Sequence, residues 1–260
     1  NALKLALEKD NLDIYNYLLE LPDIKIGDKC FSNCKKLREF TIPPNITTLG
    51  DYSFENCINL QKIIITSNIK SIGSYAFYNC KSLEEMIIPT SVTSIGDYFI
   101  KGCSSMKNVI IPQDIKNIGN LDFSNFTLLR EIIIPRKANP KIIDKAFYKC
   151  KSLTKIEFLV SITHIGKYAF YKCESLKELT IPSTVKTIDF NAFKGCSSLK
   201  RITIDPLPSN FDEYTTAICT SLMKNYQMPN FKIDKNTIIL DGTYHDIILP
   251  YDPDKENHRI

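Results

Sequence analysis

Cysteines recur along this 260-residue chain at a fixed interval of 23 residues. Two runs keep this interval, namely Cys34, Cys57, Cys80 and Cys103, and then Cys150, Cys173, Cys196 and Cys219. The gap between the runs is two periods plus one residue, and Phe126 occupies the skipped position. A fixed period of about 20 to 50 residues indicates a solenoid, whose repeats bury their apolar sides against one another. Function should therefore be sought on an extended surface rather than in a deep pocket.

Each repeat has apolar residues at alternate positions shortly after its cysteine, as Met86 and Ile88 show after Leu83. Alternation with a period of two predicts one short β-strand per repeat. Proline, which cannot donate to a ladder, ends most of these strands: Pro43, Pro89, Pro112, Pro135 and Pro182. Eight stacked coils at about 4.8 Å each predict a parallel sheet roughly 40 Å long on the concave face of a curved, right-handed ribbon. Irregular turns and short helical segments are expected on the other side.

Two further columns recur in each repeat before its cysteine. The first is glycine, at Gly27, Gly50, Gly73, Gly96, Gly119 and Gly166, and Ile143 and Asp189 replace it in two repeats. Glycine at a fixed turn position indicates either a positive φ or a close approach between the backbones of adjacent coils. The second column is aromatic, at Phe31, Phe54, Phe77, Phe123, Phe147, Phe170 and Phe193, and Ile100 replaces it once. Each column is expected to point the same way in every coil.

The repeat, written L-x-x-I-x-I-P-x-x-V-x-x-I-G-x-x-A-F-x-x-C, resembles that of BspA-like leucine-rich repeat proteins, also called the Treponema pallidum type. The resemblance covers residues 24–222 and implies a leucine-rich repeat solenoid. Thr66 and Leu159 depart from the pattern at the proline position, and the stretch 136–141 holds one extra residue, which predicts a small bulge in the turn.

Nine cysteines would suggest disulfides in a secreted chain, but their spacing argues for free thiols. One cysteine per coil in the same column predicts a buried ladder, in which each thiol serves as a small apolar side chain. Cys30 lies outside this column, among small residues, and is also expected to be buried. No C-x-x-C pair is present, so we predict no zinc site and no other metal or cofactor.

The remaining composition excludes several classes of function. A net charge of +4 is too balanced to require nucleic acid. No run of 18 apolar residues and no signal peptide are visible, so we predict no transmembrane segment. The three histidines, of which His164 is expected in a solvated turn, do not combine into a catalytic motif. We therefore predict that the chain is not an enzyme.

The two ends of the chain differ from the repeats. Residues 1–23 have helical spacing and resemble part of an ankyrin repeat, so this segment is expected to be a helical cap over the first coil or an ankyrin-like remnant. Residues 223–260 are expected to form a degenerate cap and tail. Within them, 237–240 and 246–249 flank Asp241-Gly242 and predict a capping hairpin.

The outward face of the predicted sheet carries the candidate binding surface. The central outward column contains four consecutive isoleucines, Ile64, Ile87, Ile110 and Ile133. The column two residues earlier is polar, with Lys62, Glu85, Asn108 and Glu131 beside them. A contiguous apolar stripe with a charged rim is typical of a protein interface. The alternatives are that isoleucine simply suits a strand, or that a neighbouring segment covers the stripe.

These features predict a protein–protein interaction module, which we expect to be a monomer. The family resemblance implies a cell-surface adhesin that binds host matrix or plasma proteins. The sequon at Asn45 lies in a predicted turn and would suit a glycan on a secreted chain. The alternative is an intracellular scaffold, which the unpaired cysteines and the ankyrin-like start favour, because reducing compartments keep thiols free. Location therefore stays open between the cell surface and the cytoplasm.

Overall fold

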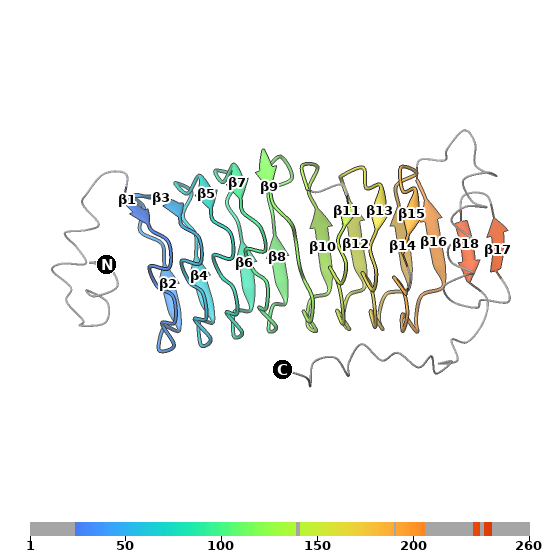
Figure 1. The fold of residues 1–260 in the computed structure, drawn as a ribbon, viewed down its shortest axis with the longest axis horizontal. Helices are drawn as coiled ribbons and strands as arrows, with labels where there is room; N and C mark the ends of the chain where they lie inside the picture. The colour runs from blue at the N-terminus through green and yellow to red at the C-terminus, as the bar shows by residue number, and fades with distance from the viewer. Residues whose placement is uncertain (1–23, 139–140, 190, 206–230, 235–236, 241–260) are drawn as a thin grey trace.

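The computed structural model describes residues 24–138, 141–189, 191–205, 231–234 and 237–240. In this part of the chain, successive coils stack side by side along the long axis of the molecule (Figure 1). Each coil contributes two strands, which build two ladders on different sides of the stack. The predicted solenoid of about 23-residue coils with parallel strands is thus confirmed. The second strand of each coil was not foreseen.

The even ladder contains the strands that the alternating pattern predicts. They are β2 (Glu39–Thr41), β4 (Lys62–Ile64), β6 (Glu85–Ile87), β8 (Asn108–Ile110), β10 (Glu131–Ile134), β12 (Lys155–Phe158), β14 (Glu178–Ile181) and β16 (Arg201–Ile204). Parallel hydrogen bonding joins β2 to β4, β6 to β8, β10 to β12 and β14 to β16. Between these pairs the strands pack against each other, and the bond from Glu84 N–H to the Gln61 carbonyl connects the segments before β4 and β6.

The odd ladder is built from one strand that precedes the first even strand and from one strand after each even strand from β2 to β14; most of these strands have two residues. They are β1 (Ile24–Ile26), β3 (Ile46–Leu49), β5 (Ser71–Ile72), β7 (Ser94–Ile95), β9 (Asn117–Ile118), β11 (Lys141–Ile142), β13 (His164–Ile165) and β15 (Thr187–Ile188). β1 to β9 form one parallel sheet and β11 to β15 another. The break between β9 and β11 falls where the repeat gains one residue. Residues 139 and 140 of that stretch lie outside the described residues.

Turns, rather than the short helical segments expected, form the corner that precedes each cysteine; the residues that the structure describes include no helix. The N–H groups of Lys29, Phe31 and Asn33 donate to carbonyls of the next coil at 2.7–2.8 Å. Lys29 and Asn33 also have a positive φ, and the pattern repeats in later coils. A helix is excluded because these N–H groups bond between coils and one or two residues per corner are left-handed.

Close packing between adjacent coils explains why the residues of the glycine column are glycines. A Cβ added to Gly73 would lie 2.5 Å from Asp51 Oδ1 and 2.6 Å from Asp51 N, which the structure cannot accommodate. The Asp51 carboxylate is fixed there because its Oδ1 accepts the N–H of Ser74 at 2.7 Å. Of the two explanations for this column, close approach is therefore correct, and the positive φ values belong to other corner positions.

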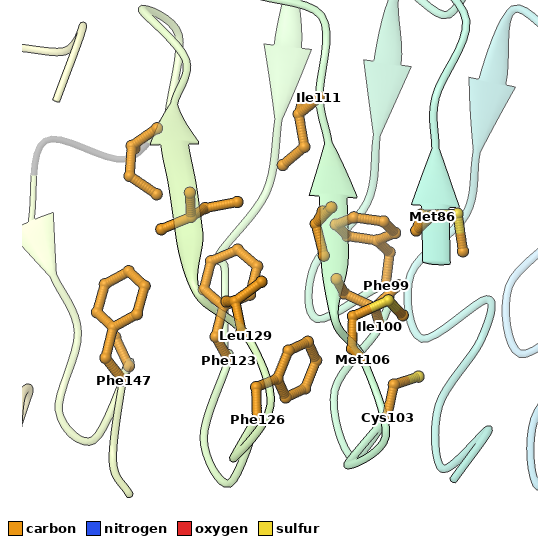
Figure 2. Packing of buried hydrophobic residues seen from close by; sticks show 14 of the residues in the cluster. Met86, Phe99, Ile100, Cys103, Met106, Ile111, Phe123, Phe126, Leu129 and Phe147 are labelled. Carbon is orange, nitrogen blue, oxygen red and sulfur yellow. The ribbon is translucent and has the colours of Figure 1, made fainter. Parts of the chain in front are cut away.

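The core is a set of stacked columns that runs through the coils. Phe54 and Phe77 are fully buried with ring centroids 5.3 Å apart, and Phe147 and Phe170 are stacked at 5.2 Å. Phe126 takes the cysteine position of its coil, packs edge-on against Phe123 at 5.7 Å, and is fully buried. Figure 2 shows it beside Phe123 and Leu129, on the coil next to that of Cys103.

The C-terminal end of the even ladder is closed by strands of opposite direction. β16 pairs antiparallel with β18 (Thr237–Leu240), which in turn pairs antiparallel with β17 (Phe231–Asp234). A strand at 237–240 was expected and is present, and it pairs with β17 at 231–234. The predicted segment 246–249, most of the tail and the helical cap at 1–23 lie outside the described residues.

Candidate protein-binding surface

Four isoleucines form an exposed stripe across β4, β6, β8 and β10, as the alternation predicted. The exposed fractions are 45% for Ile64, 55% for Ile87, 49% for Ile110 and 38% for Ile133. Their neighbours along each strand point inward, which gives the exposed–buried–exposed pattern of these strands. Ile87 and Ile110 are direct register partners in the β6–β8 pair. We call these four residues the isoleucine stripe.

The polar column beside the stripe is also exposed. Lys62, Glu85, Asn108 and Glu131 begin β4, β6, β8 and β10, and each side chain points to the same face as the isoleucine two residues later. Register pairs Glu85 with Asn108 across the two strands. A further polar column, which sequence reasoning missed, precedes this one and contains an ion pair between Lys107 Nζ and Glu84 Oε2 at 2.8 Å. Both side chains are more than half exposed, so the ion pair contributes little to the stability of the fold. Its main effect is on the charge pattern of this surface.

The sheet face is hollowed at one end of the stripe. An open depression of about 690 Å³ is lined by Gln61, Lys62, Ile63, Ile64, Ile65, Glu84, Glu85, Ile87 and Pro89. It combines two stripe residues with three charged side chains. A partner could therefore bury apolar surface at its centre and meet charge at its rim, which is the usual anatomy of a protein interface.

The other half of the same face has a different chemistry. After Ile133 the central outward column continues with Glu157, Thr180 and Thr203. A second depression of about 680 Å³ lies there, lined mainly by polar residues that include Lys155, Glu157, Lys177, Glu178 and Asp205. Sequence reasoning did not single out this half, although the change from isoleucine to glutamate in one column was the available signal. The apolar surface thus covers only part of the even ladder.

The cysteine column forms the predicted buried ladder of free thiols. Each thiol donates to the carbonyl of the aromatic-column residue in the preceding coil. The Sγ–O distances are 3.1 Å for Cys57, Cys80 and Cys150, 3.2 Å for Cys103 and Cys173, and 3.0 Å for Cys196. Cys30 is buried as expected, Cys34 is partly buried, and every described cysteine is free. Cys219 lies outside the described residues.

Burial keeps three of these thiols, Cys80, Cys150 and Cys173, in the protonated form. Desolvation raises the pKa of Cys80, Cys150 and Cys173 above the ordinary value, and neighbouring thiols raise it further at Cys80 and Cys173. The thiolate is the nucleophilic form, so these three thiols are poor nucleophiles in the folded chain. The role of the ladder is structural.

His164 differs from the expectation of a solvated turn residue. It lies in β13, where its Nδ1 is 2.6 Å from Thr187 Oγ1 and its Nε2 is 3.2 Å from Asp189 Oδ2. These contacts connect neighbouring coils of the odd ladder. His245 and His258 lie outside the described residues. Within the described ranges, no three His, Cys, Asp or Glu side chains are grouped to hold a metal ion, and no helix is long and apolar enough to cross a membrane.

The chain belongs to the leucine-rich repeat proteins of the BspA type. The profile described as BspA type leucine-rich repeat region matches residues 24–151 and 140–238, with six copies of the repeat. Such repeat regions are, in general, protein-interaction modules. No protein with a curated function matches the sequence.

Solved structures of similar fold include a leucine-rich repeat protein from Bacteroides ovatus, which is 31% identical with a TM-score of 0.58. The match covers 69% of this chain and 46% of that one, so this chain spans less than half the length of that protein. The T. pallidum leucine-rich repeat protein is 24% identical with a TM-score of 0.51, over 60% of this chain and 73% of that one. The second likeness shows the fold alone.

Proposed function

We propose that this chain binds a protein partner through the isoleucine stripe and its polar rim. The observation that carries the proposal is the exposure of four isoleucines at the same position of four successive even strands, with Ile87 and Ile110 as register partners. Large apolar side chains that lie next to one another on a surface favour burial against a partner, since each buried side chain contributes about 1.5–3 kcal/mol. Lys62, Glu85, Asn108 and Glu131 would select the partner through charge and hydrogen bonding at the edge of the contact.

The specific role that we propose is adhesion at a cell surface. The partner would be a matrix or plasma protein of a host, and the chain would act as a monomer. This finer proposal is supported by the resemblance to BspA-like proteins. An intracellular scaffold is the second candidate, because the free cysteines of the described chain suit a reducing compartment. Labelling intact and permeabilised source cells with an antibody to this chain separates the two, since only a surface protein is labelled on intact cells.

The binding test compares two double variants in the same outward column. Ile87→Glu with Ile110→Glu places two charges at the centre of the stripe, whereas Thr41→Glu with Thr180→Glu places them on exposed positions outside it. We expect the isoleucine variant to lose partner capture by at least tenfold and the threonine variant to retain it, with both chains folded by circular dichroism. If the isoleucine variant captures the partner as well as the unmodified chain, the stripe is not the binding surface.

A further inference from the structure

The residue immediately before the ladder cysteine changes along the solenoid, and it is glycine at Gly102 and Gly195. In the first three coils it is asparagine, at Asn33, Asn56 and Asn79, with φ of 62°, 56° and 58°. Asparagine tolerates this left-handed conformation better than most residues. The amides also bond to one another, from Asn56 Nδ2 to Asn33 Oδ1 at 3.3 Å and from Asn79 Nδ2 to Asn56 Oδ1 at 3.2 Å. In these coils the column therefore serves stability.

Lysine takes the same position in two adjacent coils of the second half. Lys149 and Lys172 have φ of 59° and 55°, so the backbone of each lysine is in the left-handed region, which long side chains disfavour. Like charges at matching positions of neighbouring strands or coils repel each other. On both grounds we expect lysine to be less stable than asparagine in this column, although a left-handed lysine also occurs at Lys29, in another column of the first coil. Local rules are typically broken in this way where a surface has another function.

Tyrosine rings hold the lysine ammonium groups at this corner. Lys149 Nζ lies 5.2 Å from the centroid of Tyr148, and Lys172 Nζ lies 5.3 Å from that of Tyr171. The two rings are stacked with centroids 5.0 Å apart. Lys145 Nζ also lies over Tyr148, at 5.8 Å. Cation–π contacts of this kind orient the ammonium groups and leave their charge intact.

Positive charge is concentrated on this corner. Residues 143–151, 166–174 and 189–197 contain the lysines Lys145, Lys149, Lys151, Lys167, Lys172 and Lys194, and the acids Asp144, Glu174 and Asp189. All three carboxylates have partners: Asp144 Oδ1 accepts the Lys167 N–H at 2.8 Å, Glu174 Oε1 lies 3.4 Å from Lys151 Nζ, and Asp189 pairs with His164. The matching corners of the first three coils are balanced, with Lys29, Lys35 and Lys81 against Asp28, Asp51 and Glu55.

We propose that this lysine–tyrosine corner binds a sulfated polysaccharide. Lysine-rich clusters attract polyanions, and lysines one coil apart, at about 4.8 Å, form a row suited to a linear chain of sulfate groups. The faces of Tyr148 and Tyr171 are occupied by each other and by ammonium groups, so they offer no platform for a nucleobase. The large apolar side chains exposed in the described residues lie elsewhere, on the stripe and at Leu128, which disfavours a lipid surface.

The test uses heparin oligosaccharides of defined length, with binding measured by calorimetry at low and high salt. Lys149→Asn with Lys172→Asn introduces the residue that the first three coils have at this position. The melting temperature of this variant should therefore equal or exceed that of the unmodified chain. We expect affinity to fall about tenfold or more and the salt dependence to weaken, because two ionic contacts are removed. Lys70→Asn with Lys116→Asn removes the same charge from exposed positions outside the corner and should leave affinity unchanged.

Three results would overturn the proposal: no binding of heparin, equal affinity in the Lys149/Lys172 variant, or equal binding of desulfated heparin. Duplex DNA or anionic vesicles that bind as tightly as heparin would also overturn it, since the corner would then be an unspecific cationic patch. If the asparagine variant melts lower than the unmodified chain, Lys151→Gln with Lys167→Gln tests the same corner at residues that do not have a positive φ. That pair should also weaken heparin binding about tenfold.

Discussion

Cys80 donates its thiol hydrogen to the main-chain carbonyl oxygen of Phe54, which lies 26 residues earlier, over a distance of 3.1 Å. The same relationship repeats through the described ladder and connects each coil to the one before it. It explains why a column of small residues is cysteine rather than alanine. The thiol fills the space of a small apolar side chain and adds a second donor to a carbonyl that already accepts the main-chain N–H of Cys57 at 3.2 Å.

We predict that stability falls as the pH rises above about 8.5, the ordinary pKa of a cysteine thiol. The folded chain keeps Cys80, Cys150 and Cys173 protonated because burial raises their pKa. The unfolded chain releases these protons, so it binds fewer protons than the folded chain and is favoured by alkaline pH. Urea unfolding midpoints measured from neutral to alkaline pH provide the test. A variant with all three residues changed to alanine should lose stability less steeply over the same range, and an identical slope would contradict the assignment.

Gly73→Ala should destabilise the chain by about 1–3 kcal/mol. The new methyl group would meet the main chain and the carboxylate of Asp51, which the adjacent coil holds in place. Gly27→Ala is the matched control, because nothing lies within 4 Å of a Cβ built there. Chemical denaturation of both variants gives the comparison. Equal losses of stability in the two variants would mean that backbone conformation, and not close approach between coils, requires glycine in this column.

Phe126→Cys would complete the cysteine column of the repeat, yet we expect it to cost about 2–4 kcal/mol. Phe126 is fully buried and packs edge-on against Phe123, so a cysteine would leave a cavity that the coil cannot fill. Thermal unfolding would show a clear drop in melting temperature. An unchanged or raised melting temperature would show that the consensus residue packs as well as phenylalanine does.

Much of the architecture was predictable because every column has the same environment in each coil. The recurrence of Cys57, Cys80 and Cys103 predicted burial, and the alternation around Ile87 predicted the exposed stripe. The odd ladder was not predicted, since strands such as Ser71–Ile72 are too short for alternation to be visible. The corners were expected to include helical turns because their hydrogen bonds to the next coil leave no periodic pattern in the side chains.

The surfaces were predictable only in part. Exposure of the isoleucine stripe followed from its period, but the depression beside it depends on the relative placement of neighbouring strands. The lysine–tyrosine corner had a readable signal, namely the change from Asn33, Asn56 and Asn79 to Lys149 and Lys172 in one column. Its significance required the φ values and the ring contacts, which a sequence does not contain.

The break in the odd ladder between β9 and β11 has a consequence for cooperativity. In a solenoid, stability is the sum of the repeats and the couplings between neighbours, so the weakest coupling divides the molecule into folding units. Here the aromatic stack is also altered, with Ile100 in place of phenylalanine just before the break. Native-state hydrogen exchange should therefore show β1 to β9 and β11 to β15 opening with different free energies, whereas a single common value would show that the coils unfold together.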